Sequence, residues 1–142
     1  MNSNKSQKIT ACAFIHRNGK MLGVQRAAHK KFLPNKWEIV GGHIEFGESI
    51  EEGLLREIKE ELGIEIEIEH LFYAFTYLKD ESTHSIEVVY LARPKSNQEI
   101  SLDPDALQKY KWLSKNEALE LYDSNNSEYP AIIKGFELVE IQ

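Results

Sequence analysis

The residues from Gly41 to Ile64, GGHIEFGESIEEGLLREIKEELGI, carry the clearest structural pattern in the chain. At a helical period of about 100° per residue, side chains three and four residues apart lie on the same face. Gly63 follows the last apolar residue of the pattern and is a natural helix stop. The sequence therefore predicts a helix from Ser49 to Leu62 with an acidic face and a separate apolar stripe. The acidic face carries Glu57, Glu60 and Glu61, and the apolar stripe carries Leu54, Ile58 and Leu62.

The segment that leads into this helix is rich in glycine. Gly41 and Gly42 follow an apolar, strand-like run from Trp37 to Val40, and Gly47 comes just before the helix start, so we expect the chain to make a tight, glycine-permitted turn there. Such a turn can present backbone carbonyl and N–H groups to a ligand without interference from side chains. Glu48 and Ser49 supply the acidic and capping groups of a helix N-terminus, and either could be the N-cap residue.

The acidic face of the helix has two interpretations. Like charges at these spacings destabilise an exposed helix by about 0.2 to 0.5 kcal/mol per pair, and by more where water is excluded. A divalent cation between the carboxylates would turn this repulsion into attraction. The simpler interpretation is a solvated acidic surface, which is what most glutamate-rich helices present. The glycine-rich entry segment favours the metal site.

From Gly42 onward, the spacing of fixed residues resembles the complete Nudix box, the signature of the Nudix (MutT-like) hydrolase family. The glycine is followed by five residues, Glu48, seven residues, Arg56-Glu57-Ile58, one residue, Glu60-Glu61, one residue, and Gly63-Ile64. Every fixed position is present, and chance agreement is on the order of 10⁻⁸ per starting position. The box covers less than a fifth of the chain, so it is a local signal of high specificity.

The resemblance implies an α/β protein with the Nudix fold, which is an α/β/α sandwich with a mixed sheet and a central catalytic helix. It also implies metal-dependent hydrolysis of a nucleoside diphosphate linked to another group, giving a nucleoside monophosphate and phosphate or a phosphorylated product. The stretch from Leu78 to Ser82 lacks the Pro or Tyr typical of some Nudix groups. Nucleoside triphosphates, including oxidised ones, are therefore slightly preferred over ADP-ribose or nucleotide sugars. A non-catalytic, nucleotide-sensing Nudix module is a further alternative, although all box carboxylates are present.

The resemblance assigns a cofactor and its ligands. Mg²⁺ or Mn²⁺ takes oxygen ligands, and a few carboxylates with a carbonyl are sufficient. Glu57 and Glu60 are the first candidates for the general base. The implied metal ligands are the Gly41 carbonyl and the carboxylates of Glu57, Glu60 and Glu61. Weaker candidates for the base are Asp105, Glu81 and Glu87, and Glu87 is expected either on a solvated strand face or in a pocket.

The remaining site residues are expected to hold the loop and the substrate. Arg56 is expected to act in catalysis by tying the loop to the helix through Glu48, while pairing with Glu52 or Glu60 within the helix is the alternative. Substrate contacts are expected from Gly42 and from Arg26, which ends its strand near the loop. A surface ion pair is an equally good interpretation of Arg26. The basic segment from Ala27 to Asn35 is expected either to overhang the phosphate site or to be a solvated connection, and Trp37 to be core or to border a base pocket.

The flanking sequence predicts a single domain. Residues 1–7 are expected to form a disordered tail, and residues 8–142 a single Nudix hydrolase domain. Asn18-Gly19 between two runs of strand-forming residues predicts a β-hairpin. The predicted strands are Ile9–His16, Met21–Arg26, Glu65–Tyr77, His84–Ala92 and Lys109–Leu113, and two further helices are expected after the N-cap Ser114 and from Tyr129 to Ile141.

Composition limits the partners of this chain of 142 residues. A net charge of −6 argues against binding to duplex nucleic acid by generic phosphate attraction. No apolar run approaches the roughly 20 residues of a membrane span, and the polar N-terminus is unlike a signal peptide. Cys12 is the only cysteine, so no intramolecular disulfide can form, and we expect a buried strand thiol. We expect a cytoplasmic protein that avoids membranes, and the family resemblance implies a nucleotide substrate and is compatible with a homodimer.

Overall fold

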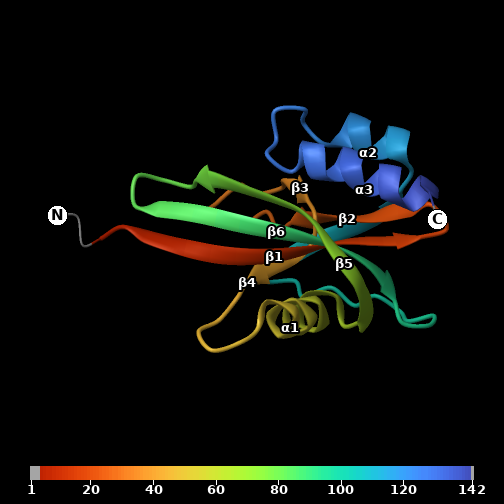
Figure 1. Ribbon diagram of the computed structural model, residues 1–142, viewed down its shortest axis with the longest axis horizontal. Helices are drawn as coiled ribbons and strands as arrows, with labels where there is room; N and C mark the ends of the chain where they lie inside the picture. Colours follow the sequence, from red (N-terminus) through yellow and green to blue (C-terminus); the bar gives the residue numbers. More distant parts are fainter. Residues whose placement is uncertain (1–3, 142) are drawn as a thin grey trace.

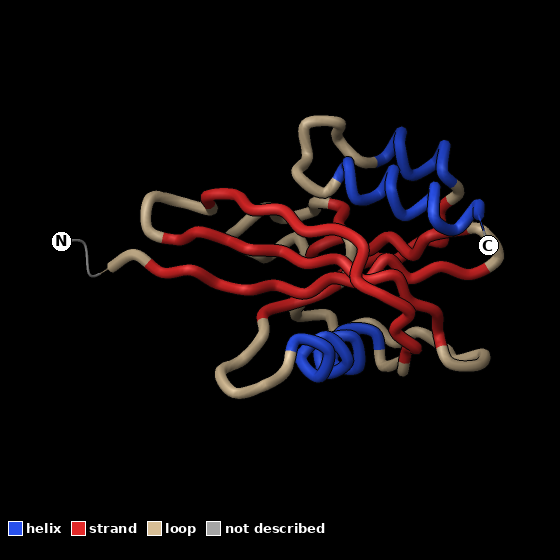
Figure 2. Tube along the Cα trace, viewed as in Figure 1, coloured by secondary structure: helices blue, strands red, loops and turns tan. Residues whose placement is uncertain are grey.

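The computed structural model describes residues 4–141, which fold as a mixed β-sheet between helical layers (Figure 1). Helix α1 lies on one face of the sheet, and α2 and α3 lie together on the other, as the expected α/β/α sandwich requires (Figure 2). The fold class is therefore confirmed. The elements are β1 Ser6–Arg17, β2 Lys20–Arg26, β3 Trp37–Glu38, β4 Gly41–His43, α1 Ile50–Leu62, β5 Ile66–Leu78, β6 Thr83–Pro94, β7 Leu107–Leu113, α2 Lys115–Leu121 and α3 Tyr129–Ile141.

Strand β1 is the centre of the sheet. It pairs in parallel with β6 from Ser6 to Ile15, and it pairs antiparallel with β2 through the tight turn at Asn18 and Gly19. Both turn residues have positive φ, 54° and 77°, as the predicted hairpin requires. The described strands form a seven-stranded sheet in the order β3-β2-β1-β6-β5, with β4 paired to β1 and β7 paired to β2.

Two hydrophobic clusters hold the layers together. Because side chains alternate along β1, Ala11, Ala13 and Ile15 face α1, whereas Cys12 and Phe14 face α2 and α3. On the first side, the predicted stripe of α1 is fully buried, with Leu54, Ile58 and Leu62 at 0% exposure. On the second side, the Phe14 ring meets the Phe136 ring edge to face, at 5.1 Å between centroids. Cys12 is buried, as expected.

Helix α1 begins and ends where its capping chemistry predicts. The Ser49 side chain accepts a hydrogen bond from the backbone N–H of Glu52, so Ser49, rather than Glu48, is the N-cap residue. At the other end, Gly63 has φ of 70°, and its N–H donates to the Lys59 carbonyl. Among the described residues, no helix is both long and apolar enough to cross a membrane.

The expected glycine turn before α1 forms at Gly47 and not at Gly41 and Gly42. Gly41 and Gly42 belong to β4, which pairs antiparallel with β1 through Cys12 and Ala11. Glycine is needed here for close approach, since a Cβ at Gly41 would lie 2.1 Å from the Ala11 carbonyl oxygen. The chain turns later, at Gly47, where φ is 89°.

The expected disordered tail is also too long. Ser6 and Gln7 are already part of β1, opposite Thr83 and His84 of β6, because the parallel ladder satisfies their backbone hydrogen bonds. Residues 1–3 of the expected tail lie outside the described residues.

The close contact between β4 and β1 predicts a large effect of one methyl group. Gly41→Ala should lower the free energy of unfolding by about 3 kcal/mol, because the added Cβ meets rigid backbone rather than a movable side chain. Urea denaturation monitored by circular dichroism measures the change. Gly19→Asn is the matched control, since a Cβ there meets nothing within 4 Å and asparagine tolerates positive φ; it should change stability by less than about 1 kcal/mol. A Gly41→Ala variant as stable as this control would contradict the close approach.

Candidate active site

A pocket of about 300 Å³ opens beside the N-terminal part of β4 and the acidic face of α1. Carboxylates from α1 lie on one side of it, and the backbone of β4 crosses beneath them. Basic side chains come from the end of β2, from the segment after it and from the turn after β5. The lining residues are Thr10, Cys12, Arg26, Lys30, Phe32, Leu33, Lys36, Glu38, Ile39, Gly41, Gly42, His43, Glu57, Glu61, Tyr77, Lys79, Ser85, Glu87 and Glu128.

Glu57 lies directly against β4. Its side chain is 17% exposed, and a Cβ at Gly42 would come within 2.2 Å of its carboxyl carbon and of Oε2. Gly42 is therefore the residue that leaves room for this carboxylate. Burial raises the pKa of Glu57, and the Arg56 guanidinium opposes this rise.

Glu61 lies one helical turn further along α1 and faces the same pocket. Burial raises its pKa to about 8, and the neighbouring charge of Glu57 adds to this effect. A pair of carboxyl groups in a partly dehydrated site repels unless a proton or a cation lies between them. The acidic face is therefore not a solvated surface at these positions.

Arg56 binds the loop before α1 to the helix itself. Its Nε and Nη2 donate to the two carboxylate oxygens of Glu48, at 2.9 and 2.7 Å, and Nη2 also donates to the His43 carbonyl oxygen at 3.0 Å. Its Nη1 donates to Glu57 at 3.1 Å and to Glu60 at 3.2 Å. Of the three partners considered for Arg56, Glu48 and Glu60 are therefore contacted at once, whereas Glu52 is not among its partners in the described part of the chain.

Glu60 is the box carboxylate that the structure leaves outside the pocket. Its side chain is 56% exposed and pairs with Arg56, and it is not among the lining residues. Glu57 and Glu61 are thus brought together with Gly41 and Gly42, whereas Glu48 and Arg56 lie behind them and hold the loop.

The donor set fits a hard divalent cation. Carboxylates of α1 and backbone of β4 border one pocket, and such oxygen groups are the ligands that Mg²⁺ and Mn²⁺ prefer. Within residues 4–141, however, no three His, Cys, Asp or Glu side chains are already gathered around a common point. One carboxylate oxygen of Glu57 and one of Glu60 accept hydrogen bonds from Arg56, at 3.1 and 3.2 Å.

The basic side of the pocket includes the predicted Arg26. Its Nε donates to the Phe32 carbonyl at 3.0 Å, and its Nη1 lies 3.5 Å from Glu38, so it anchors the segment from Ala27 to Asn35. This ion pair is largely buried rather than at the surface. Lys30 and Phe32 of the same segment line the pocket, in agreement with the expected overhang.

The structure decides between several sequence expectations about single residues. Glu87 is only 7% exposed and lines the pocket, so the solvated alternative is wrong; it comes from β6, whose two faces are both covered. Asp105 and Glu81 are exposed and do not line the pocket, because each lies in a turn away from β4. Trp37 packs, half-buried, against the core on the α2 and α3 side and does not line the pocket.

Four further lining residues had no signal in the sequence. Lys36 and Lys79 lie in connections, and Glu128 lies in a polar break before α3. Tyr77 ends an aromatic alternation along β5 that signals a strand face but not a pocket. The antiparallel pairing of β5 with β6 brings Tyr77 close to Glu87, and no local pattern reveals that pairing in advance.

Comparison with known proteins agrees with this geometry. The sequence model of the NUDIX domain matches residues 6–134. Nucleoside triphosphatase NudI of Salmonella paratyphi B is 34% identical over 129 residues, which cover 84% of this chain and 89% of that protein. The crystal structure of MutT protein from Methanosarcina mazei Go1 superposes with a TM-score of 0.81 at 20% identity, covering 99% of this chain and 100% of that one.

A second solved structure gives the same result for the fold. The solution structure of the E. coli ORF135 protein has a TM-score of 0.77 at 24% identity and covers 99% of this chain and 95% of that one. At such identities, the solved structures establish the similarity of fold alone.

The Glu48–Arg56 pair predicts a pH-dependent contribution to stability. Hydrogen bonds from Arg56 lower the pKa of Glu48 from 4.5 to about 2 in the folded protein. A lowered folded-state pKa stabilises the fold above the unfolded-state value, and this contribution is lost as the pH falls from about 4.5 through about 2. Glu48→Gln should therefore lower the melting temperature near neutral pH, and the difference from the wild type should shrink on acidification.

Thermal unfolding followed by circular dichroism across the acidic range measures this difference. Glu52→Gln on the exposed side of α1 serves as the control, since no charged partner contacts its side chain among the described residues. A Glu48→Gln effect that stays constant between neutral pH and pH values below 4.5 would show that the carboxylate charge is not responsible.

Proposed function

Because the chain belongs to the Nudix hydrolase family, we propose that it hydrolyses nucleoside triphosphates to nucleoside monophosphates with the help of a divalent cation. The observation that carries this proposal is that one pocket is lined both by box carboxylates of α1 and by basic side chains from other segments. A polyphosphate chain bound between them would meet cations on both sides once a metal is present. The name of the NudI relative supports triphosphates as the substrate class.

The basic residues are proposed to bind the phosphates. Lys30 and Lys36 come from the segment after β2, and Lys79 comes from the turn after β5. Lys79 lies over the Phe32 ring, with Nζ at 4.6 Å from the ring centroid, so an aromatic face limits its movement. Arg26 is held by the Phe32 carbonyl and Glu38, and we expect it to orient this segment in addition to contacting the substrate.

The box residues are proposed to hold the cation and to move the proton. Bound Mg²⁺ or Mn²⁺ would neutralise phosphate charge and increase the acidity of water at the site. Glu57, Glu61 and the Gly41 carbonyl border the pocket and are the proposed ligands, with Glu60 next to them on the same helix face. Because Arg56 binds Oε1 of Glu57, we favour Oε2, which faces Gly42, as the atom that takes a proton from the attacking water.

Two alternatives remain distinguishable by experiment. Hydrolysis of ADP-ribose or nucleotide sugars would use the same carboxylates but fewer of the basic groups. A sensing module would bind nucleotides without turnover, and the intact Arg56–Glu48 connection argues against a decayed site. A homodimer and a cytoplasmic location stay predictions from the sequence.

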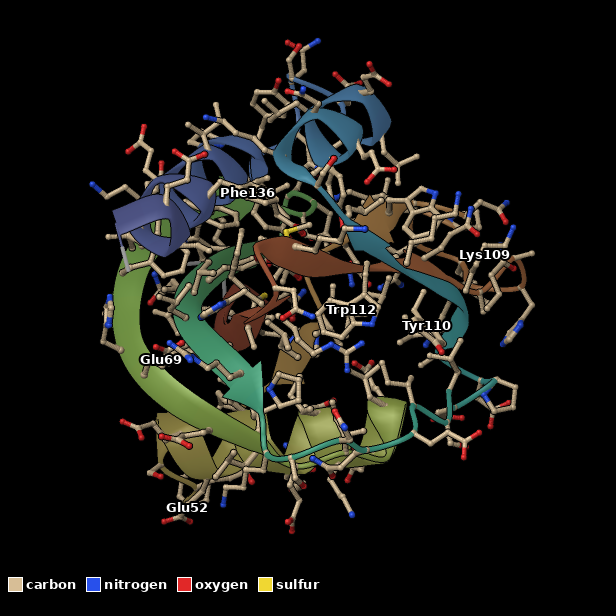
Figure 3. All side chains as sticks on the ribbon, turned by 90° about the vertical axis from the view of Figure 1, so that its right-hand side faces the viewer. Glu52, Glu69, Lys109, Tyr110, Trp112 and Phe136 are labelled. Carbon is tan, nitrogen blue, oxygen red and sulfur yellow. The ribbon has the colours of Figure 1, made fainter. Side chains whose placement is uncertain are left out.

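The central experiment is hydrolysis of a nucleotide panel by the purified protein with Mg²⁺, read out by chromatography of the products. Glu57→Gln should lower kcat/KM for the best triphosphate by at least about 100-fold, because it removes charge from the metal side of the pocket. Glu52→Gln is the matched control on the same helix, and Figure 3 shows Glu52 on the side of α1 turned away from the sheet. This control should stay within about twofold of the wild type.

Metal removal provides an independent check. Chelation should abolish turnover, and added Mg²⁺ or Mn²⁺ should restore it. Equal activity of Glu57→Gln and wild type, or full activity after chelation, would contradict the proposed mechanism. Turnover of ADP-ribose or nucleotide sugars in preference to every triphosphate would replace the proposed substrate class.

A further inference from the structure

A second hollow, of about 540 Å³, lies at the end of the sheet opposite to the turn between β5 and β6 (Figure 1). Its lining comes from the end of β1 with the turn after it, and from the end of β6 with the turn after it. Among the described residues, it shares no lining residue with the candidate active site. His16 in this hollow lies four residues along β1 from Cys12 in the active site, which is about 13 Å of extended strand.

The lining of this hollow is rich in hydrogen-bond donors. Arg17 and Arg93 contribute guanidinium groups, and Asn18, Ser96 and Asn97 contribute amide and hydroxyl groups that can also donate. Within the described part of the chain, no carboxylate lines it. The whole chain carries a net charge of −6, so a hollow lined in this way departs from the rest of the protein. Its chemistry suits an anion.

Arg17 is held in place without being neutralised. Its Cζ lies 4.3 Å from the centroid of the Trp112 ring, which is a cation–π contact. Among residues 4–141, no Asp or Glu forms an ion pair with Arg17. The contact with the ring restricts the side chain, and a guanidinium that lies over a ring can still donate from its edge. The charge of Arg17 is therefore positioned for a ligand and not consumed by a carboxylate.

Arg93 is oriented by a different group. Its Nε lies 3.4 Å from Oε1 of Glu69 on β5, and the same oxygen is hydrogen-bonded to Nε2 of His16 at 2.5 Å. His16 is only 5% exposed, so the Glu69 carboxylate is anchored to the interior of the protein. Figure 3 looks at this end of the molecule, with Glu69 on one side and Trp112 on the other. Neither of these two residues lines the hollow, and Glu69 offsets only one of the two guanidinium charges.

We propose that this hollow binds a phosphoryl oxyanion, either as an inorganic anion or as the phosphate of a mononucleotide. Guanidinium groups bind phosphate oxygens through paired, charge-assisted hydrogen bonds. A phosphoryl group offers three strong acceptor oxygens, one more than a carboxylate, and can therefore accept from Arg17, Arg93 and the neighbouring amides at once. The site goes beyond the proposed hydrolysis, because it is separate from the pocket in which that reaction is proposed.

The fluorescence of Trp112 reports on this site. Trp37→Phe removes the other of the two tryptophans, and Trp37 lines neither this hollow nor the active site. Titration of this variant without metal, using inorganic phosphate, pyrophosphate and AMP, should change the emission of Trp112 until it saturates, because an anion on Arg17 alters the cation beside the ring. Acetate at equal ionic strength should give no saturable change. Absence of a saturable change with all three phosphoryl anions, or an equal response to acetate, would overturn the proposal.

Arg17→Gln tests the contribution of the unpaired guanidinium. Calorimetric titration without metal should show that the anion bound most tightly by the wild type is bound at least about 10-fold more weakly by this variant, the size expected for one hydrogen bond to a charged group. Lys109→Gln is the matched control, since Lys109 is an exposed cation on β7 that does not line the hollow (Figure 3). It should bind as the wild type does. Equal affinities of Arg17→Gln and Lys109→Gln would overturn the assignment.

The same titrations identify the source of the phosphoryl group. Binding of AMP about 10-fold tighter than that of inorganic phosphate would assign the site to a mononucleotide, and equal or weaker binding of AMP would assign it to an inorganic anion. Circular dichroism checks the fold of each variant. If Arg17→Gln does not fold, the Trp112 titration decides, and if Trp37→Phe does not fold, calorimetry decides. Because no measurement involves turnover, a failure of the proposed hydrolysis would leave these results unchanged.

Discussion

The contacts of the Arg56 guanidinium are the interaction on which the site depends. One planar group binds both oxygens of Glu48 in the loop and one oxygen each of Glu57 and Glu60 on α1. A bidentate guanidinium–carboxylate contact fixes direction as well as distance, which an ammonium group could not do. The loop and the helix are therefore held in one arrangement, in which Glu57 lines the pocket while Glu60 pairs with Arg56 at its exposed edge.

This arrangement works because β4 lies unusually close to its neighbours. Gly41 leaves no room for a side chain beside the β1 backbone, and Gly42 leaves none beside the Glu57 carboxylate. The helix can come this near because Leu54, Ile58 and Leu62 pack into the sheet on its other face. Burial of that stripe thus brings Glu57 and Glu61 into a partly dehydrated space. There, the attraction between a divalent cation and the carboxylates would be stronger than in water.

The parts of the fold and site that depend on neighbouring residues could be predicted from the sequence. The parts that depend on pairing between distant segments could not. Asn18-Gly19 and Ser49 act on their own neighbours, so the hairpin and the start of α1 follow from the sequence. The box spacing likewise predicted that Glu57 and Glu61 would share one face. The glycine turn was correct at Gly47 but wrong at Gly41 and Gly42, because glycine also permits close packing within a strand. The sequence left Glu87 undecided between a solvated face and a pocket, and Glu128 was missed, because their burial depends on segments 75 and 89 residues distant.

The pocket therefore combines carboxylates of α1 with basic side chains, and the proposed hydrolysis requires that these carboxylates hold a cation. A crystal structure with Mn²⁺ and a non-hydrolysable nucleoside triphosphate, recorded at the manganese absorption edge, tests this most directly. We predict an anomalous peak bonded to oxygens of Glu57 and Glu61 and to the substrate phosphates. A nucleotide bound in the pocket with manganese elsewhere, or with those carboxylates directed away from it, would contradict the account.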